Sequence, residues 1–230
     1  MRRILSTIVL ASAALLLASC GSSQTKKSEK NGTEAEAGIM IDEAHVYTEL
    51  KKMPLPCSKE LLYAAWKQIG ENEASRGKAL DYRQNSPVFF ISTDLDEDGN
   101  PEVLLRSEPP YAAIFTFLQD SLQLITYVEH PQVGLGITPD GCIVRNGTGG
   151  GNAYFSEFIR LENSEVAAKG MTRETFSIQD NAMRSDGTEY MLQTDTAKAK
   201  VSKEEYQKVA PAQSGTYLED IEGWEDFRKP

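Results

Sequence analysis

The sequence predicts an α+β domain in which N-terminal helices pack on an antiparallel β-meander. Three observations carry this prediction. Residues 59–76 place apolar side chains three and four positions apart, which is typical of an amphipathic helix. After Pro87 the chain changes to short apolar or alternating runs, which are typical of strands. Turn residues such as Asn163-Ser164 separate these runs and favour consecutive hairpins.

Two helices are expected before the strands, at Ile41–Met53 and Lys59–Arg76. Ser58 is the expected N-cap of the second helix, because its hydroxyl can accept a backbone N–H from the first turn. The apolar stripe of this helix needs a sheet to cover. It contains Leu61, Leu62, Ala65, Trp66 and Ile69.

Strand pairs are expected at three places. They are Val88–Ser92 with Val103–Ser107, Ala113–Gln119 with Leu122–Val128 across Asp120-Ser121, and Tyr154–Leu161 with Val166–Met171 across Asn163-Ser164. Asp140-Gly141 and Asp186-Gly187 predict further hairpin turns.

A short helix is expected near the C-terminus, at Lys203–Ala210, because Ser202 and Glu205 fit a capping box. Trp224 and Phe227 are expected to anchor the tail that follows.

The first 19 residues are typical of a secretory signal peptide. Arg2 and Arg3 precede the apolar run Ile4–Leu17, which is shorter than the roughly 20 residues of a membrane-spanning helix. The junction Leu17-Ala18-Ser19-Cys20 resembles the lipobox of bacterial lipoproteins. This resemblance implies cleavage before Cys20 and acylation of its thiol, as with palmitate. The alternative is an ordinary signal peptide with a cysteine near the cut.

The lipobox resemblance implies a protein anchored to a bacterial membrane through Cys20. Gly21 after the cysteine favours the outer membrane, with the protein facing the periplasm. Residues 20–38 have no large apolar side chain and are expected to form a flexible tether. Residues 39–230 then form a single α+β domain.

The chain is acidic, with a net charge of -10, and removal of Arg2 and Arg3 with the signal peptide takes this to -12. Nucleic acid is therefore excluded as an expected partner, because its phosphates require Lys and Arg. Cys57 and Cys142 either form a disulfide or remain free, and the sequence slightly favours two free thiols.

Carboxylates are concentrated between two predicted strands. Asp94, Asp96 and Asp98 alternate, Gly99 allows a sharp turn, and Asn100 and Glu102 follow. A tight loop with acids at positions one, three and five turns oxygen ligands toward a common centre, which suits Ca²⁺. The loop is not an EF-hand, because Leu105 replaces the glutamate at position twelve.

This pattern resembles the calcium loops of FG-GAP and VCBS repeats. The resemblance covers about Leu61–Met171 and implies Asp94, Asp96, Asp98, Asn100 and Glu102 as ligands, whereas Glu97 departs from the usual residue at position four. The alternative is an acidic turn that stays solvated without a metal.

A second candidate site is the glycine-rich segment Gly149, Gly150, Gly151 and Asn152, which could contact a ligand. No catalytic residue is assigned. Asp42-Glu43-Ala44-His45 matches a helicase motif, but the chain has no phosphate-binding loop of the kind a helicase requires. His130 is not accompanied by a G-x-S-x-G nucleophile motif.

The sequence favours a non-catalytic role in binding an unidentified envelope protein or glycan. The alternatives are a hydrolase of envelope polymers and an inhibitor or chaperone-like lipoprotein.

Overall fold

The computed structural model describes residues 50–75, 89–107, 111–128, 132–148, 150, 152–179, 182–193, 197–212 and 215–227. All of them belong to one compact unit, which spans Ala37–Pro230. The predicted signal peptide, Cys20 and the tether lie outside the described residues, as do His45 and His130.

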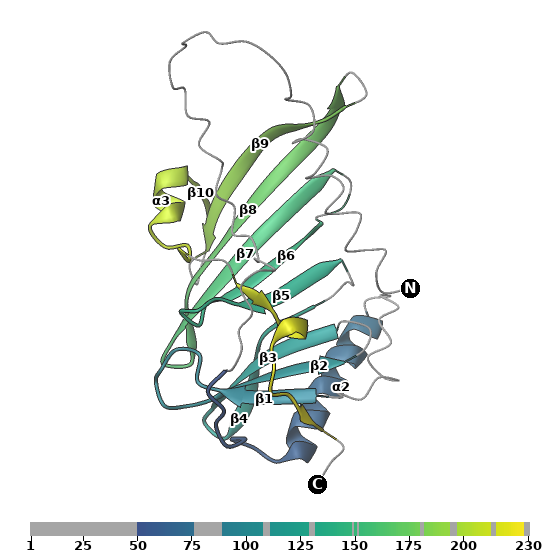
Figure 1. Ribbon diagram of the computed structural model, residues 1–230, viewed down its shortest axis with the longest axis vertical. Helices are drawn as coiled ribbons and strands as arrows, with labels where there is room; N and C mark the ends of the chain where they lie inside the picture. Colours follow the sequence, from purple (N-terminus) through teal and green to yellow (C-terminus); the bar gives the residue numbers. More distant parts are fainter. Residues whose placement is uncertain are drawn as a thin grey trace, which may run out of the picture. The chain divides into compact units, whose positions relative to one another are not determined.

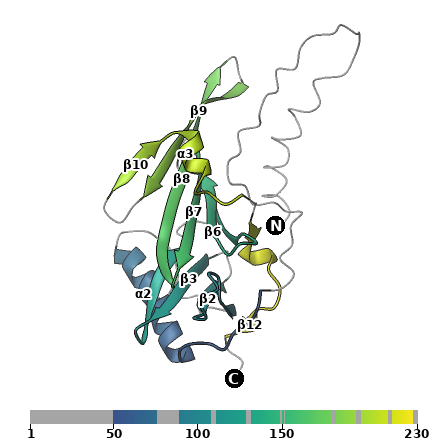
Figure 2. The same ribbon diagram turned by 90° about the vertical axis from the view of Figure 1, so that its left-hand side faces the viewer.

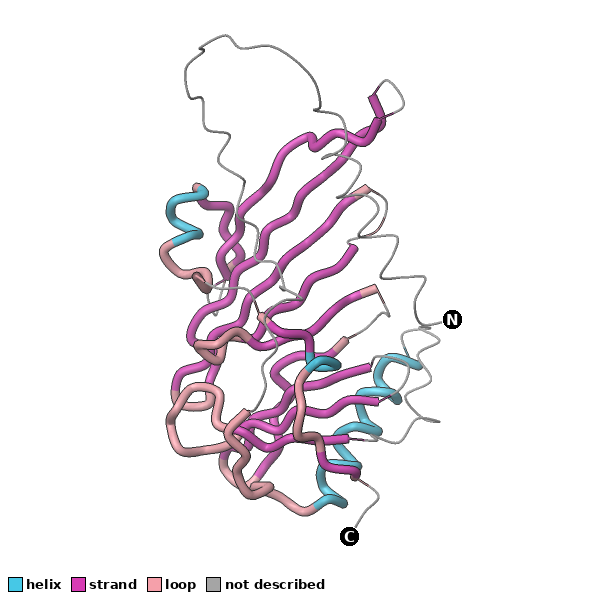
Figure 3. The backbone as a smooth tube through the Cα atoms, in the orientation of Figure 1, coloured by secondary structure: helices cyan, strands magenta, loops and turns pink. Residues whose placement is uncertain are grey.

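Antiparallel strands make up most of the described chain and form two sheets (Figures 1 and 3). The five-stranded sheet has the order β12-β1-β2-β3-β4, and the seven-stranded sheet has the order β10-β9-β8-β7-β6-β5-β11. Neighbours follow one another along the chain except for β11 and β12, so the predicted meander is confirmed.

The five-stranded sheet consists of β1 (Phe89–Thr93), β2 (Glu102–Ser107), β3 (Tyr111–Leu118), β4 (Ser121–Tyr127) and β12 (Glu225–Asp226). The seven-stranded sheet consists of β5 (Val133–Ile137), β6 (Ile143–Thr148), β7 (Ala153–Glu162), β8 (Glu165–Gln179), β9 (Ala182–Gln193), β10 (Lys198–Val201) and β11 (Thr216–Tyr217). The helical elements of the described chain are α2 (Lys59–Ser75), α3 (Lys203–Gln207) and the 3-10 turn η1 (Leu218–Asp220).

A hydrophobic core joins the two sheets. Buried side chains of β1–β3 and of β5–β7 belong to one cluster, whose central members are Ile91, Leu104, Ile114, Ile137, Ile143 and Ile159. Removing this apolar surface from water is the main force that holds the sheets together.

Both faces of β1, β2 and β3 in the five-stranded sheet are largely buried, which explains their uninterrupted apolar runs. Successive residues of a strand point to opposite faces. In β2, Leu104 points into the core between the sheets, whereas Val103 and Leu105 point to the other face and join a second cluster with α2. The run Val103-Leu104-Leu105 therefore serves two cores.

Helix α2 covers that second face (Figures 1 and 2). Its first turn is capped as predicted, because the Ser58 hydroxyl accepts the Leu61 N–H at 3.2 Å. Leu62, Trp66 and Ile69 are buried against the sheet, and Leu61 is 41% exposed. The contact stripe is thus narrower than predicted.

The first predicted helix is wrong at its end, Leu50–Met53. Residues 41–49 lie outside the described residues, but Lys52 forms a β-bridge with Thr93 and the Met53 N–H donates to the Ser92 carbonyl at 2.8 Å. Pro54 follows directly, and a proline disfavours helical geometry in the residue before it.

The predicted hairpins are confirmed at four places: β1–β2, β3–β4, β5–β6 and β7–β8 pair antiparallel. Asn163 and Ser164 both have positive φ, at 53° and 61°, as the two central residues of a tight hairpin turn require. The β3–β4 turn lies one residue earlier than predicted, because Gln119 and Asp120 are its positive-φ residues.

The turn predicted at Asp186-Gly187 is wrong. Both residues lie inside β9, where Thr175 pairs with Gly187 and Phe176 pairs with Ser185. Asp186 is therefore the extra residue of a β-bulge. Gly187 has φ 130°, a conformation that glycine adopts readily. An Asp-Gly pair can form either a turn or a bulge. Here it forms a bulge, because β9 pairs with β8 on both sides of Asp186.

The C-terminal segment contributes an edge strand to each sheet, since β11 pairs with β5 and β12 pairs with β1. Before it, Ser202 and Glu205 form the predicted capping box, but α3 ends at Gln207 instead of Ala210. Trp224 and Phe227 pack against the two cores, as predicted. The Arg106 guanidinium lies over the rings of Phe89 and Trp224, at 5.0 Å and 4.8 Å.

Candidate metal centre

The loop between β1 and β2 is closed by its first carboxylate. Asp94 accepts the Asp98 N–H at 3.1 Å through Oδ1 and the Gly99 N–H at 2.9 Å through Oδ2. Gly99 has φ 92°, which explains why glycine follows the third aspartate. Residues 94–99 thus form a tight bend between the end of β1 and the start of β2.

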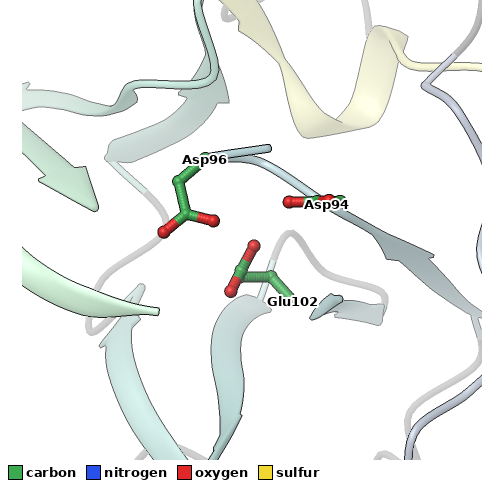
Figure 4. A group of neighbouring side chains, drawn as sticks. All are labelled: Asp94, Asp96 and Glu102. Atoms are coloured by element: carbon green, nitrogen blue, oxygen red, sulfur yellow. The ribbon is translucent and has the colours of Figure 1, made fainter. Parts of the chain in front are cut away.

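Three carboxylates converge inside this bend. One oxygen each from Asp94, Asp96 and Glu102 lie within 4.8 Å of one another, and Figure 4 shows the side chains facing a common space. Two oxygens that share one calcium ion at about 2.4 Å are at most about 4.8 Å apart. The spacing of the three oxygens therefore suits a single ion.

Glu102 is the most buried member of the group, with 0% of its surface exposed. Its Oε2 accepts the Leu95 N–H at 2.9 Å. Its Oε1 is buried and makes no hydrogen bond of standard geometry, although the neighbouring Thr116 hydroxyl lowers the Glu102 pKa. A buried carboxylate oxygen without a partner is costly.

Asp96 also has one buried oxygen without a hydrogen-bond partner. Its Oδ2 accepts the Ser164 N–H at 2.8 Å, whereas its Oδ1 is buried and has no hydrogen-bond partner. The centre thus contains two orphaned acceptor oxygens, one on each side of the bend. A cation would satisfy both.

Two carboxyls of the group, Glu102 and Asp96, have raised pKa values. Burial raises the pKa of Glu102 to about 7, and the charges of Asp96 and Asp98 raise it further. Burial also raises the Asp96 pKa, with a smaller contribution from the charges of Asp98 and Asp94. Burial, reinforced by the neighbouring negative charges, therefore opposes ionisation of both carboxyls.

Asp98 does not join this group of carboxylates. Asp98 Oδ1 accepts the Asn100 N–H at 2.6 Å, and Asp98 Oδ2 accepts the Ser164 hydroxyl at 2.8 Å and the Asn100 amide at 3.2 Å. Partial burial opposes ionisation of Asp98, but these hydrogen bonds outweigh it and lower the pKa. Of the five predicted ligands, the structure brings together Asp94, Asp96 and Glu102.

Sequence reasoning missed Ser164. It was assigned to a turn, and it does form one, but its N–H and hydroxyl also bind two loop aspartates more than 60 residues earlier in the chain. The positive φ expected at this turn was a signal for a small polar residue. Nothing in the spacing connects it to the acidic loop.

The residues present suit a hard divalent cation. Carboxylate oxygens are the preferred ligands of Ca²⁺, which takes six to eight oxygens and tolerates irregular geometry. Asp94, Asp96 and Glu102 would hold the ion, whose two positive charges would offset two of the three neighbouring negative charges. Two buried carboxylate oxygens without hydrogen-bond partners, Asp96 Oδ1 and Glu102 Oε1, are the observation that supports this fit.

The predicted glycine-rich ligand segment lies between β6 and β7. Gly149 and Gly151 are outside the described residues, whereas Gly150 and Asn152 are exposed. The Asn152 carbonyl accepts the Phe176 N–H at 2.8 Å, which ties this end of the segment to β8.

The two domain cysteines are free. Cys142 is buried, and its thiol donates to the Ile159 carbonyl at 3.3 Å; burial raises the pKa of this thiol to about 12. Cys57 is partly exposed, and burial raises its pKa to a lesser degree.

Comparison of the chain with protein-family models, with curated proteins and with solved structures finds no match. The likeness of the β1–β2 loop to FG-GAP and VCBS calcium loops therefore stays a prediction from the residues. None of the described helices is both long and apolar enough to cross a membrane.

Proposed function

We propose that the chain is a lipid-anchored protein of the bacterial cell envelope whose β-rich domain binds one calcium ion in the β1–β2 loop and serves a non-catalytic binding role. In this proposal Cys20 carries the acyl chains, residues 20–38 form the tether, and the domain faces the periplasm from the outer membrane. Its fold is the predicted α+β arrangement of helices on an antiparallel meander with a calcium-loop hairpin.

The observation that carries the metal site is the pair of buried oxygens without partners, Asp96 Oδ1 and Glu102 Oε1, at the point where three carboxylates converge. Like charges at this spacing repel, and burial strengthens the repulsion because water screens it less. Ca²⁺ suits the site better than Mg²⁺, because Mg²⁺ prefers regular octahedral geometry and retains its waters.

The position of the site supports a structural role for the ion. The three acids close a bend between adjacent strands. Asp94 and Glu102 accept hydrogen bonds from backbone N–H groups of the same bend. An ion here would fix the geometry of the β1–β2 hairpin. Binding by an envelope protein or glycan would then use a domain that calcium has made rigid.

Thermal unfolding tests the calcium site. Full-length chain with Cys20→Ser, which removes the acylation site, is melted with calcium, with magnesium and with EDTA. At calcium a hundred times above its Kd, the folded state gains about 2.7 kcal/mol, which raises the Tm by about 5 to 10 °C. Equal melting temperatures in calcium and EDTA, with no heat on calcium titration, would refute the site.

Metabolic labelling tests the anchor. Cells that express the chain are fed an alkyne-bearing fatty acid, and the label on the protein is compared between Cys20 and Cys20→Ser. We expect label and membrane association for the natural residue and neither for serine. Equal labelling of both chains would exclude Cys20 as the anchor.

Cross-linking in the intact envelope tests the binding role. We expect repeated recovery of one envelope protein or glycan, and no release of fragments when the purified chain is incubated with envelope polysaccharide. Release of fragments by the chain would instead support the hydrolase alternative.

A further inference from the structure

The acidic loop and the β7–β8 turn belong to different sheets, yet they are bonded through one residue. Ser164 lies in the turn between two strands of the seven-stranded sheet, and Asp96 and Asp98 lie in the loop that enters the five-stranded sheet. The Ser164 N–H donates to Asp96 Oδ2 and its hydroxyl donates to Asp98 Oδ2, both at 2.8 Å. Only 1% of Ser164 is exposed.

The identity of this residue is informative. Position 164 has φ 61°, where asparagine, aspartate or glycine fits more easily than serine. Serine is used at a conformational cost, and its hydroxyl is fully engaged by Asp98. The matching turn at Gln119-Asp120 has the same positive φ values. The side chain at 164 is therefore explained by the contact with the loop and not by the turn alone.

The two bonds set the orientation of both aspartates. By holding Asp96 Oδ2, the Ser164 N–H fixes the orientation of the Asp96 carboxylate, which contributes one oxygen to the group with Asp94 and Glu102. By holding Asp98 Oδ2, the hydroxyl keeps Asp98 directed at the turn and at Asn100. Ser164 thus determines which loop carboxylates are available to an ion.

We propose that Ser164 is a positioning residue of the metal centre and that a cation held by Asp94, Asp96 and Glu102 fastens the β7–β8 turn to the β1–β2 loop. This inference rests on the proposed calcium site. The connection runs from β2 through Glu102, the ion and Asp96 to Ser164, so it joins the two sheets at a point outside their shared hydrophobic core.

Coupling of this kind is reciprocal: whatever calcium binding adds to the order of the turn, the turn adds to calcium affinity. Removing the ion should therefore loosen the β7–β8 turn, although no ligand comes from it. Removing the Ser164 hydroxyl should weaken calcium binding, although serine does not touch the ion.

Calcium titration of turn variants tests the affinity half of the proposal. Ser164→Gly keeps the positive φ and deletes the hydroxyl, and Asp120→Gly makes a comparable change in the β3–β4 turn. In the full-length Cys20→Ser chain, we expect Ser164→Gly to raise the calcium Kd by about tenfold, as loss of a hydrogen bond to a carboxylate can do. Asp120→Gly should leave the Kd within about twofold of the parent value.

Hydrogen exchange tests the structural half. Calcium is expected to slow amide exchange in peptides that cover residues 94–102 and 160–168 and to leave β9 and β10 unchanged. In Ser164→Gly, calcium should still protect the loop but should protect the turn less, because the hydroxyl bond to Asp98 is gone and only the N–H bond to Asp96 remains. Loss of protection at both places would show that the folded variant no longer binds calcium. That result would also support a positioning role for Ser164 and contradict a merely structural one.

The two proposals fail differently. An unchanged calcium Kd in folded Ser164→Gly, or calcium protection confined to residues 94–102, would overturn the connection and leave the calcium site standing. If the parent chain binds no calcium by titration, both the site and the connection are overturned.

Discussion

Two glutamates are buried in the described part of the fold, and the protein treats them in opposite ways. Glu157 of β7 is 7% exposed, and its two oxygens form ion pairs with Arg145 at 2.7 Å and with Lys169 at 2.9 Å. Glu102 of β2 is completely buried and faces two further carboxylates. Within the described ranges, no lysine or arginine forms an ion pair with Asp94, Asp96 or Glu102.

The difference shows where each counter-charge comes from. At Glu157 the neighbouring strands supply both cations, because Arg145 pairs with Glu157 across β6 and β7 and Lys169 lies on β8. At Glu102 the neighbouring groups Asp94 and Asp96, in the part of the chain that the structure describes, add negative charge. The first arrangement is complete within the protein, and we propose that a cation from solution completes the second.

The largest expected effect is at the ion-paired glutamate. Glu157→Gln leaves Arg145 and Lys169 facing each other without their carboxylate and should lower the free energy of unfolding by about 3 kcal/mol, with or without calcium. Chemical denaturation in calcium and in EDTA measures it. Glu189→Gln is the control, because Glu189 and Lys200 form an exposed pair whose loss should change the stability much less. A calcium-dependent loss at Glu157 would break the contrast between the two sites.

The second largest effect is expected when the other buried glutamate, Glu102, is likewise replaced by glutamine. Glu102→Gln removes a ligand and should abolish the stabilisation of about 2.7 kcal/mol that calcium at a hundred times its Kd provides. In EDTA the variant should be as stable as the parent or more stable, because an uncompensated buried charge is gone. Parallel melts in the two buffers check this. Destabilisation in EDTA would mean that Glu102 is already compensated without an ion.

A pH dependence follows for the calcium-free chain. The Glu102 pKa rises from 4.5 to about 7 on folding because the carboxyl is buried. The folded state therefore holds this proton more tightly than the unfolded state, so the contribution to stability is complete below about pH 4.5 and is lost as the pH rises through about 7. In EDTA, the parent chain should lose more stability between pH 5 and pH 8 than Glu102→Gln does. Identical pH profiles would contradict the raised pKa.

The smallest effect is expected at Glu97, which lies in the same loop but is exposed. Glu97→Gln removes one negative charge without removing a ligand. The calcium Kd should rise by less than about threefold, since exposed charges are screened by water and salt. Calorimetric titration would detect a larger change, which would place Glu97 among the ligands.

The hairpins and the acidic loop were predictable because local residues determine them. Gly99 and the alternating aspartates define the bend, and turn residues mark the β7–β8 hairpin. Asp186-Gly187 shows the limit of local reasoning, because pairing with β8 converts an expected turn into a bulge.

The composition of the candidate centre was less predictable. Spacing alone makes Asp98 equivalent to Asp94 and Asp96, and its hydrogen bonds to Asn100 and to the Ser164 hydroxyl distinguish it. That contact depends on how two sheets pack. The cation partners of Glu157 likewise depend on cross-strand register, since Arg145 is twelve residues from Glu157 in the chain. Such long-range contacts leave no local pattern.

The placement of β11 and β12 also bears on how the protein is made. Each sheet obtains one of its outermost strands from residues 216–226, close to the end of the chain. During synthesis, both sheets must therefore wait for residues 216–226 before these two edges are covered, and an uncovered edge invites pairing with other chains. Termination shortly before Thr216 would leave two open edges on one molecule, so the product would be prone to aggregation and not merely shorter.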